Sequence, residues 1–166
     1  MSQTQPGEIT TTDNQRLWDI RFLRDARTRA AWSKDPSTKA GAVLTRGKLP
    51  ISQGFNGFAH GVKDTTERLN NRQVKYQLVI HAEVNAILHT NGPLDGTTMY
   101  VTHPPCAACA SVIAQKRVSR AVWIRPSAEF MQRWSDSVAL SMEVLSEAGV
   151  SVVEYSLDEV DDPNVV

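Results

Sequence analysis

Two short stretches, HAEVNAI at residues 81–87 and PCAAC at residues 105–109, each lead into a segment whose apolar side chains have helical spacing. The first predicted helix begins within HAEVNAI and ends at the Asn-Gly-Pro sequence of residues 91–93, because glycine and proline end helices. Pro105 suits the first position of the second helix, and the segment 98–102 between the helices predicts a strand. This helix-strand-helix unit forms the centre of the predicted fold.

Outside this unit, the hydrophobic pattern predicts two more helices and four more strands. The elements expected are a helix from residue 13 or 14 to about residue 33, a hairpin at 41–45 and 49–55, a strand at 120–124, a helix at 128–148 and a strand at 150–155. Pro50 places the second hairpin strand at a sheet edge, because proline has no N–H to donate. The antiparallel hairpin and the later crossovers predict an α/β fold, a three-layer α/β/α sandwich with a mixed sheet.

The domain boundaries follow from the segments that lack periodicity. Residues 13–157 are expected to form a single domain, and the polar ends, residues 1–12 and 158–166, are expected to be flexible. Within the domain, residues 59–77 are polar and read as a long loop with one helical turn near residues 67–74. Loops of this length tend to be functional.

Composition excludes some classes of protein. The 166 residues carry 18 basic and 18 acidic side chains, so no general attraction to nucleic acid or to an anionic membrane is expected. The sequence contains no apolar run of the roughly 18 to 20 residues that a membrane span requires, and its polar start is unlike a signal peptide. A cytoplasmic protein is therefore expected.

The two motifs together contain the ligands of a catalytic zinc site. His81, Cys106 and Cys109 supply one nitrogen and two sulfurs, which leaves the fourth tetrahedral position for water. The two cysteines lie three residues apart at the start of a predicted helix, whose N-terminus favours the thiolate form. Glu83 is too close to His81 in sequence to share the coordination easily, and it can instead carry protons for the water.

Each motif alone has an ordinary explanation. A C-x-x-C pair can be a redox dithiol, and a single histidine is more often structural than catalytic. A zinc-stabilised binding module without activity would have no use for Glu83. His60 and His103 are further potential ligands, although His103 fits better as a residue lining the mouth of a pocket.

The order H-x-E followed by P-C-x-x-C is the signature of zinc-dependent nucleobase deaminases. In that chemistry zinc lowers the pKa of water, and Glu83 takes the proton as hydroxide attacks the ring carbon that bears the amino group. Glu83 then protonates the ring nitrogen and the departing ammonia.

A wider set of segments resembles the deoxycytidylate deaminase family. The segments are SKDPSTK at 33–39, GFNG at 54–57, KY at 75–76, HAEVNAI at 81–87 and the segment 100–109. The resemblance implies hydrolysis of dCMP to dUMP and ammonia, a five-stranded α/β/α fold, a catalytic zinc ion and a homohexamer.

The resemblance also implies roles for individual residues. Asn56 is expected to contact the sugar, and the backbone at Ala82 is expected to meet the pyrimidine carbonyl oxygen; a strand-ending turn at Asn56-Gly57 is the alternative. Lys75 and Tyr76 precede the metal helix where a 5′-phosphate could be held. Lys39 and Arg125 are other basic candidates for the phosphate.

Many relatives are activated by dCTP with Mg²⁺ and inhibited by dTTP, so the resemblance implies an effector site formed by Gly54, Phe55, Asn56 and Gly57. Phe55 stands where tyrosine is common, and Ala59 where proline is frequent, which places effector binding in doubt. A second, structural zinc is not expected, because both cysteines belong to the catalytic site.

Three alternative substrates share the same metal chemistry. They are 5-substituted dCMP, another cytosine nucleotide or nucleoside, and adenosine in tRNA. The neutral net charge disfavours tRNA, because binding a polyanion requires excess positive charge.

Overall fold

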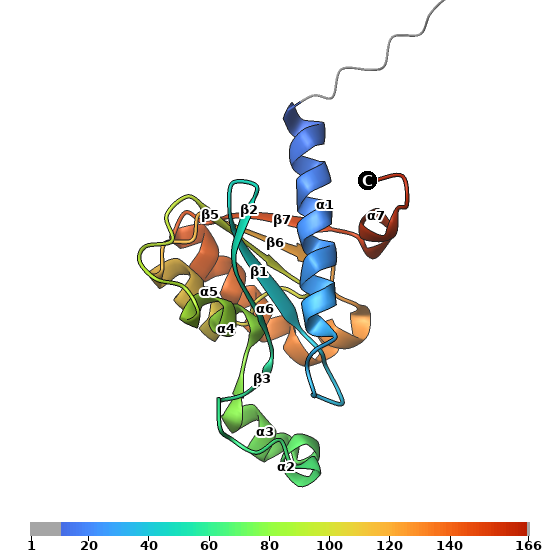
Figure 1. Ribbon diagram of the computed structural model, residues 1–166, viewed down its shortest axis with the longest axis vertical. Helices are drawn as coiled ribbons and strands as arrows, with labels where there is room; N and C mark the ends of the chain where they lie inside the picture. Colours follow the sequence, from blue (N-terminus) through green and yellow to red (C-terminus); the bar gives the residue numbers. More distant parts are fainter. Residues whose placement is uncertain (1–10, 166) are drawn as a thin grey trace, which may run out of the picture.

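The computed structural model describes residues 11–165 of the chain. Its centre is a five-stranded sheet in the order β2-β1-β5-β6-β7, shown in Figure 1. The strands are β1 (Gly41–Arg46), β2 (Leu49–Phe55), β5 (Thr97–Val101), β6 (Arg120–Ile124) and β7 (Ser151–Tyr155). The sheet is mixed as expected: β1 is antiparallel to β2 and to β5, while β5, β6 and β7 are parallel. Pro50 lies on the edge strand β2.

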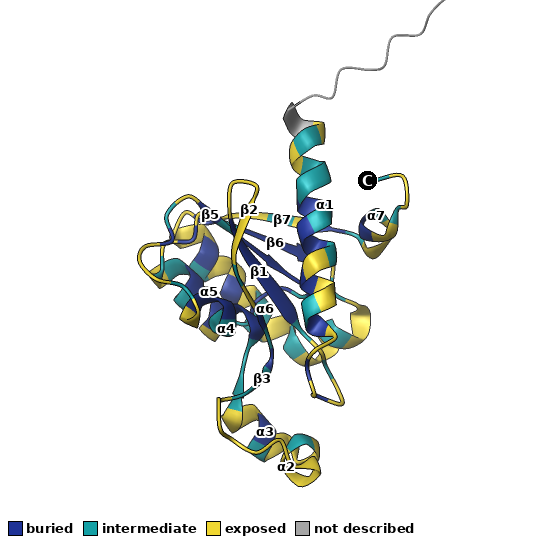
Figure 2. Cartoon of the chain, viewed as in Figure 1, coloured by how far each residue is buried: buried dark blue, intermediate teal, exposed yellow. Residues whose placement is uncertain are grey.

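Helices cover both faces of the sheet, which confirms the three-layer sandwich. On one face, α1 (Thr11–Ala30) and the short α7 (Leu157–Asp161) bury a cluster that includes Ile20, Leu23 and Val160. The other face is covered by α4 (Ala82–Leu88), α5 (Ala107–Gln115) and α6 (Ala128–Glu147). Neighbouring strand residues alternate between the two clusters, as strand geometry requires. The central strands β1, β5 and β6 are mostly buried, whereas the edge strands β2 and β7 are largely exposed (Figure 2).

Residues 56–81 leave the sheet and form a separate protrusion, seen at the bottom of Figure 1. β3 (Gly57–Phe58) and β4 (Val79–Ile80) pair at its base, and it carries α2 (Thr66–Asn70) and α3 (Arg72–Leu78). The sequence predicted a loop with one helical turn here. Two helices form instead, because the side chains of Thr65 and Asn71 each cap one of them.

The C-terminal segment differs from the expectation of a flexible end. The side chain of Ser156 caps α7, and a reciprocal bond from Glu159 completes the cap. Val160 is fully buried, and the Arg24 guanidinium donates to the carbonyls of Val160, Asp162 and Val165. This segment is therefore folded onto α1. The expectation for the N-terminus falls mostly on residues 1–10, which lie outside the described residues.

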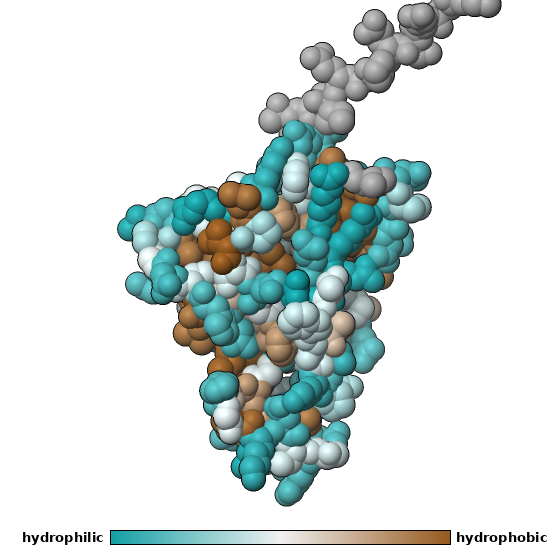
Figure 3. All heavy atoms as spheres, viewed as in Figure 1, coloured by the Kyte–Doolittle hydropathy of each residue, from teal (hydrophilic) through white to brown (hydrophobic). Residues whose placement is uncertain are grey.

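Among residues 11–165 no helix is long and apolar enough to cross a membrane. In Figure 3 hydrophobic side chains reach the surface beside the β1–β2 hairpin, where Leu49 and Ile51 are exposed. Further hydrophobic areas are visible at the left edge of the view and toward the protrusion, among hydrophilic side chains.

Candidate active site

The ends of two helices bring the three predicted metal ligands together. His81 is the N-cap residue of α4, and Cys106 is the N-cap residue of α5. The Nδ1 atom of His81 lies 3.5 Å from the sulfur of Cys106 and 3.3 Å from that of Cys109. The ligand atoms of all three residues lie within 4.8 Å of one another. The structure thus places together the three residues that the sequence selected.

The electrostatics of the two thiols depend on each other. A hydrogen bond from Cys109 lowers the pKa of Cys106 to about 4. The nearby His81 contributes to this decrease, whereas burial opposes it. The same hydrogen bond and burial raise the pKa of Cys109. The pair therefore holds one negative charge readily, and a second thiolate requires a cation beside it.

Zn²⁺ fits this donor set. One imidazole nitrogen and two sulfurs at a partly buried position are the ligands that tetrahedral zinc prefers, and three protein ligands are typical of catalytic rather than structural sites. Two thiolates also offset the charge of the cation next to two helix N-termini. His60 is exposed and does not belong to the cluster.

Glu83 is buried at the metal cluster, in the first turn of α4. Burial raises the pKa of its carboxyl group, against the opposing attraction of His81. Its side chain also interacts with the Cys109 thiol. A carboxyl group with a raised pKa holds a proton more readily than one in water and can exchange it with a neighbouring group, which is the property of a general acid and base.

A pocket opens above the cluster. His81, Glu83 and Cys106 form its floor, and its walls come from the loop after α1, from α3 and from α6. The predicted residues Asn56, Lys75, Tyr76 and His103 also line it, together with Asp35, Ser37, Thr38, Ala40, Val79, Val101, Pro104, Phe130, Arg133, Trp134 and Val138. Lys39 and Arg125 are not among the lining residues.

Asn56 lines the pocket, but its side chain also supports the wall. Its Oδ1 accepts a hydrogen bond of 2.8 Å from the backbone N–H of Ala40, and its Nδ2 donates one of 2.9 Å to the carbonyl of Thr38. The amide therefore fixes the loop between α1 and β1. Its remaining hydrogen and lone pair are free to meet a ligand.

Gly54 and Ala82 are in direct contact. A β-carbon at Gly54 would lie 2.3 Å from the carbonyl oxygen of Ala82 and 2.6 Å from the backbone nitrogen of Ala86. Only glycine lets β2 approach α4 this closely. Ala82 is fully buried beside His81 at the start of that helix.

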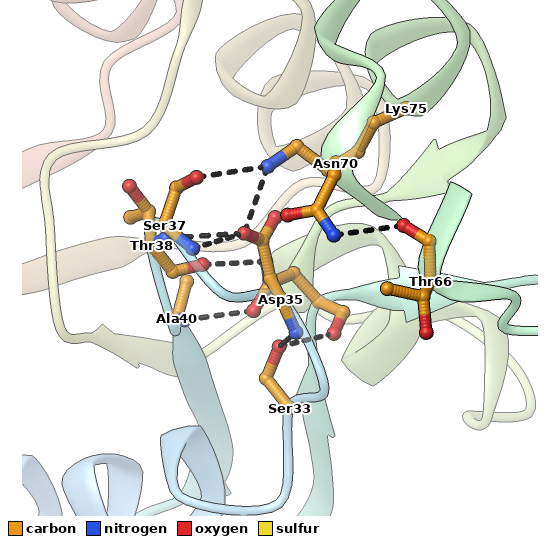
Figure 4. A network of polar contacts seen from close by, with 9 residues as sticks. Ser33, Asp35, Ser37, Thr38, Ala40, Thr66, Asn70 and Lys75 are labelled. Carbon is orange, nitrogen blue, oxygen red and sulfur yellow. Dashed lines mark hydrogen bonds and ion pairs between the residues drawn. The ribbon is translucent and has the colours of Figure 1, made fainter. Parts of the chain in front are cut away.

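Lys75 forms a buried ion pair within the pocket wall, shown in Figure 4. Its ammonium group lies 2.9 Å from Oδ1 of Asp35 and 3.2 Å from the hydroxyl of Ser37. Burial alone would raise the pKa of Asp35, but hydrogen bonds from Lys75 and from two backbone N–H groups lower it. This pair joins the protrusion to the loop after α1. Tyr76, the next residue, is half exposed.

Sequence reasoning missed the pocket wall that α6 supplies. The rings of His103 and Phe130 stack with centroids 5.0 Å apart. The ring centroid of Trp134 lies 6.2 Å from that of Phe130 and 5.9 Å from that of Tyr76. Ser137 on the same helix accepts a hydrogen bond of 3.1 Å from the backbone N–H at the start of α5. The sequence pattern that could have predicted this wall is the spacing i, i+3, i+4 and i+7 of residues 130, 133, 134 and 137, which places their side chains on one face of a helix.

Comparison with known proteins agrees with this geometry. The family model described as the cytidine and deoxycytidylate deaminase zinc-binding region matches residues 16–125. A deaminase encoded in the luxG 3′ region of Aliivibrio fischeri is 40% identical over 141 residues, which cover 85% of this chain and 95% of that protein. Mouse deoxycytidylate deaminase is 34% identical over 122 residues, 68% of this chain and 67% of that one.

The fold also matches solved structures. The dCMP deaminase of cyanophage S-TIM5, in complex with dCMP and dUMP, superposes with a TM-score of 0.65 at 21% identity, covering 89% of this chain and all of that chain. A tRNA:A34 deaminase superposes with a TM-score of 0.52 at 21% identity, covering 88% and 99%. By its sequence, its fold and its metal cluster, the chain belongs to the cytidine and deoxycytidylate deaminase family.

Proposed function

We propose that the protein is a zinc-dependent enzyme that hydrolyses dCMP to dUMP and ammonia, with a role in the supply of pyrimidine deoxynucleotides. One observation carries the proposal: His81, Cys106 and Cys109 form a cluster that can bind a metal ion, next to the buried Glu83 and in a pocket with aromatic walls. The named deoxycytidylate deaminases among the relatives support dCMP as the substrate.

The roles of the residues follow from their positions. When bound, zinc would act as a Lewis acid that lowers the pKa of a water molecule. Glu83 accepts a proton from that water as its oxygen bonds to C4 of the cytosine ring. The carboxyl group donates that proton to N3, then takes the proton of the new C4 hydroxyl group and passes it to the amino group, which leaves as ammonia as the C4–N bond breaks and C4 becomes a carbonyl. The pocket walls hold the ring in place and limit access of other water molecules.

Further residues of the pocket are proposed to bind the substrate. Asn56 has a free hydrogen and a free lone pair for the sugar, and the backbone at Ala82 lies beside the metal ligand His81 for the pyrimidine carbonyl. Tyr76 lines the pocket mouth and is half exposed. Lys75 also lines the pocket, where its pair with Asp35 holds the wall.

Regulation and assembly form a separate proposal that rests on the family resemblance. It comprises activation by dCTP with Mg²⁺, inhibition by dTTP through residues 54–57, and a homohexamer in the cytoplasm. The contact between Gly54 and Ala82 supports a link from this segment to the active site, because α4 carries His81 and Glu83.

Other substrates share this chemistry, and a substrate panel separates them. Ammonia release is measured by ultraviolet absorbance with dCMP, CMP, deoxycytidine, dCTP, 5-methyl-dCMP and a tRNA anticodon stem. We expect the highest kcat/KM with dCMP. A higher kcat/KM for a 5-substituted nucleotide or for tRNA would change the substrate assignment but not the mechanism. Activity on no cytosine nucleotide would overturn the proposal.

The mechanism is tested with Glu83→Gln, which keeps the shape of the side chain and removes its proton-carrying ability. We expect the variant to bind zinc normally and to lose about 10²- to 10⁴-fold in kcat, the usual contribution of a general acid or base. Zinc content is measured by metal analysis of the purified protein. Normal turnover in this variant would refute the role of Glu83.

A further inference from the structure

The charged groups that line the pocket differ in whether another charge already neutralises them. Asp35 and Lys75 form an ion pair with both side chains buried, so together they present no net charge. His103 is stacked on Phe130, and burial together with the nearby Arg133 lowers the pKa of its imidazole, which is neutral near pH 7. Glu83 faces the metal cluster. Among the pocket-lining residues of the described range 11–165, Arg133 is therefore the cation whose charge remains available to a ligand.

Arg133 lies where an anion can reach it. It projects from the same face of α6 as Phe130 and Trp134, and it is exposed at the mouth of the pocket. Within residues 11–165 its guanidinium takes part in no ion pair. An exposed guanidinium is less costly to keep unpaired than a buried one, and its planar donors match two phosphate oxygens at once.

The other basic candidates are less suited to this task. Lys75 would have to break its bonds to Asp35 and Ser37 and leave a buried carboxylate without a partner. Arg125 lies outside the pocket and donates to Glu154 at 2.7 Å. Lys39 is exposed and does not line the pocket.

We propose that Arg133 binds the 5′-phosphate of the substrate and thereby makes the enzyme select nucleoside monophosphates over free nucleosides. The assignment rests on the proposed function and adds the residue that determines specificity. In this arrangement the base reaches the metal cluster on the pocket floor, the aromatic residues of α6 flank the nucleotide, and the phosphate dianion meets Arg133 at the mouth.

The test compares Arg133→Gln with the wild-type enzyme on dCMP and on deoxycytidine. We expect the ratio of kcat/KM for dCMP to that for deoxycytidine to fall about 10- to 100-fold, the loss of a charge-assisted hydrogen-bonded pair. Arg133→Lys is expected to restore part of the ratio. Arg125→Gln removes a guanidinium outside the pocket and is the matched control, with an unchanged ratio. An unchanged ratio in Arg133→Gln, or an equal change in Arg125→Gln, would overturn the proposal.

A binding measurement separates this proposal from the proposed function. Calorimetric titration with dUMP and with deoxyuridine requires no turnover. We expect Arg133→Gln to weaken dUMP binding by about 10- to 100-fold and deoxyuridine binding far less. If the wild type releases no ammonia from dCMP, the proposed function fails, and the Arg133 assignment is decided by this titration alone. Equal dUMP affinity in the wild type and Arg133→Gln refutes the assignment.

Discussion

Asp19 of α1 and Arg120 of β6, 101 residues apart in sequence, form a two-pronged ion pair beneath the helix, with distances of 2.8 and 2.5 Å. Asp19 is fully buried and also accepts hydrogen bonds from the hydroxyls of Tyr100 at 2.8 Å and Tyr155 at 2.9 Å. One carboxylate thus joins α1 to three neighbouring strands, β5, β6 and β7. It fixes the helix from which the pocket loop at residues 31–40 begins.

We expect Asp19→Ala to lower the free energy of unfolding by about 3–5 kcal/mol, because it leaves a largely buried guanidinium without its partner. The two tyrosine hydroxyls lose their acceptor as well. Urea denaturation followed by circular dichroism measures the loss. The control is Asp95→Ala, which removes the exposed pair with Arg117 and should cost less than about 1 kcal/mol. Equal losses in the two variants would contradict the role of Asp19.

The free energy of unfolding should fall below about pH 4. Burial alone would raise the pKa of Asp19, but hydrogen bonds from Arg120 and Gln15 lower it, and the pKa of Asp35 is lowered in the same way by Lys75. A carboxyl group with a folded-state pKa below its unfolded value stabilises the fold above the unfolded pKa of about 4. This stabilisation is lost as the pH falls through the folded-state pKa.

The measurement is urea denaturation of the zinc-free protein at several pH values between about 3 and 6, since metal loss would otherwise contribute. We expect the free energy of unfolding to decrease most steeply below about pH 4. Asp35→Asn should have a shallower decrease than the wild type. A profile that is flat down to pH 3, or the same slope in the variant, would show that these carboxylates are not responsible.

The sequence predicted the three residues whose ligand atoms the structure brings together, because each motif is short, although the two motifs meet only through the fold. His81 and Glu83 are two residues apart, Cys106 and Cys109 are three apart, and both pairs begin helices. The order of the five sheet strands and of α1, α4, α5 and α6 was also predictable, since alternating hydrophobicity marks strands and helical spacing marks helices. The contacts of Asp19 were not predictable in this way, because its partners lie in strands far along the chain.

The role of Lys75 shows why the pocket walls were harder to predict. A lysine just before the metal helix is a reasonable phosphate ligand when only the sequence is known. In the fold Asp35, 40 residues earlier, contacts it within the pocket wall and neutralises it. Phe130, Arg133 and Trp134 enter the pocket from α6, which reads in the sequence as an ordinary amphipathic helix.

We expect Gly54→Ala to disturb the active site from a distance. The new methyl group would lie 2.3 Å from the backbone of Ala82, so α4 must shift and move His81 and Glu83 with it. Zinc affinity and kcat should both fall, by about 10-fold or more, the usual consequence of misplaced ligands and catalytic groups. Metal titration and ammonia release measure the two effects.

Gly57→Ala is the matched control, because the nearest atom to its new methyl group, in the ring of Phe55, lies 3.9 Å away. Its metal affinity and kcat should stay within about twofold of the wild type, since a contact at that distance is ordinary packing. If Gly57→Ala is as damaging as Gly54→Ala, the loss reflects the segment at 54–57 as a whole and not the contact with Ala82.

Zinc should stabilise the fold, because its ligands join the start of α4, which carries His81, to the start of α5, which carries both cysteines. At a free zinc concentration about 1,000 times its dissociation constant, binding adds about 4 kcal/mol of stability. For a chain of this size that raises the Tm by roughly 8–16 °C. Differential scanning fluorimetry before and after treatment with a chelator measures the shift.

Cys106→Ser should lose most of the shift in Tm by removing a thiolate ligand, whereas Glu83→Gln should keep it, because Glu83 carries protons and does not hold the metal. A full zinc-dependent shift in Cys106→Ser, or none in Glu83→Gln, would reverse the division between metal ligands and proton carrier.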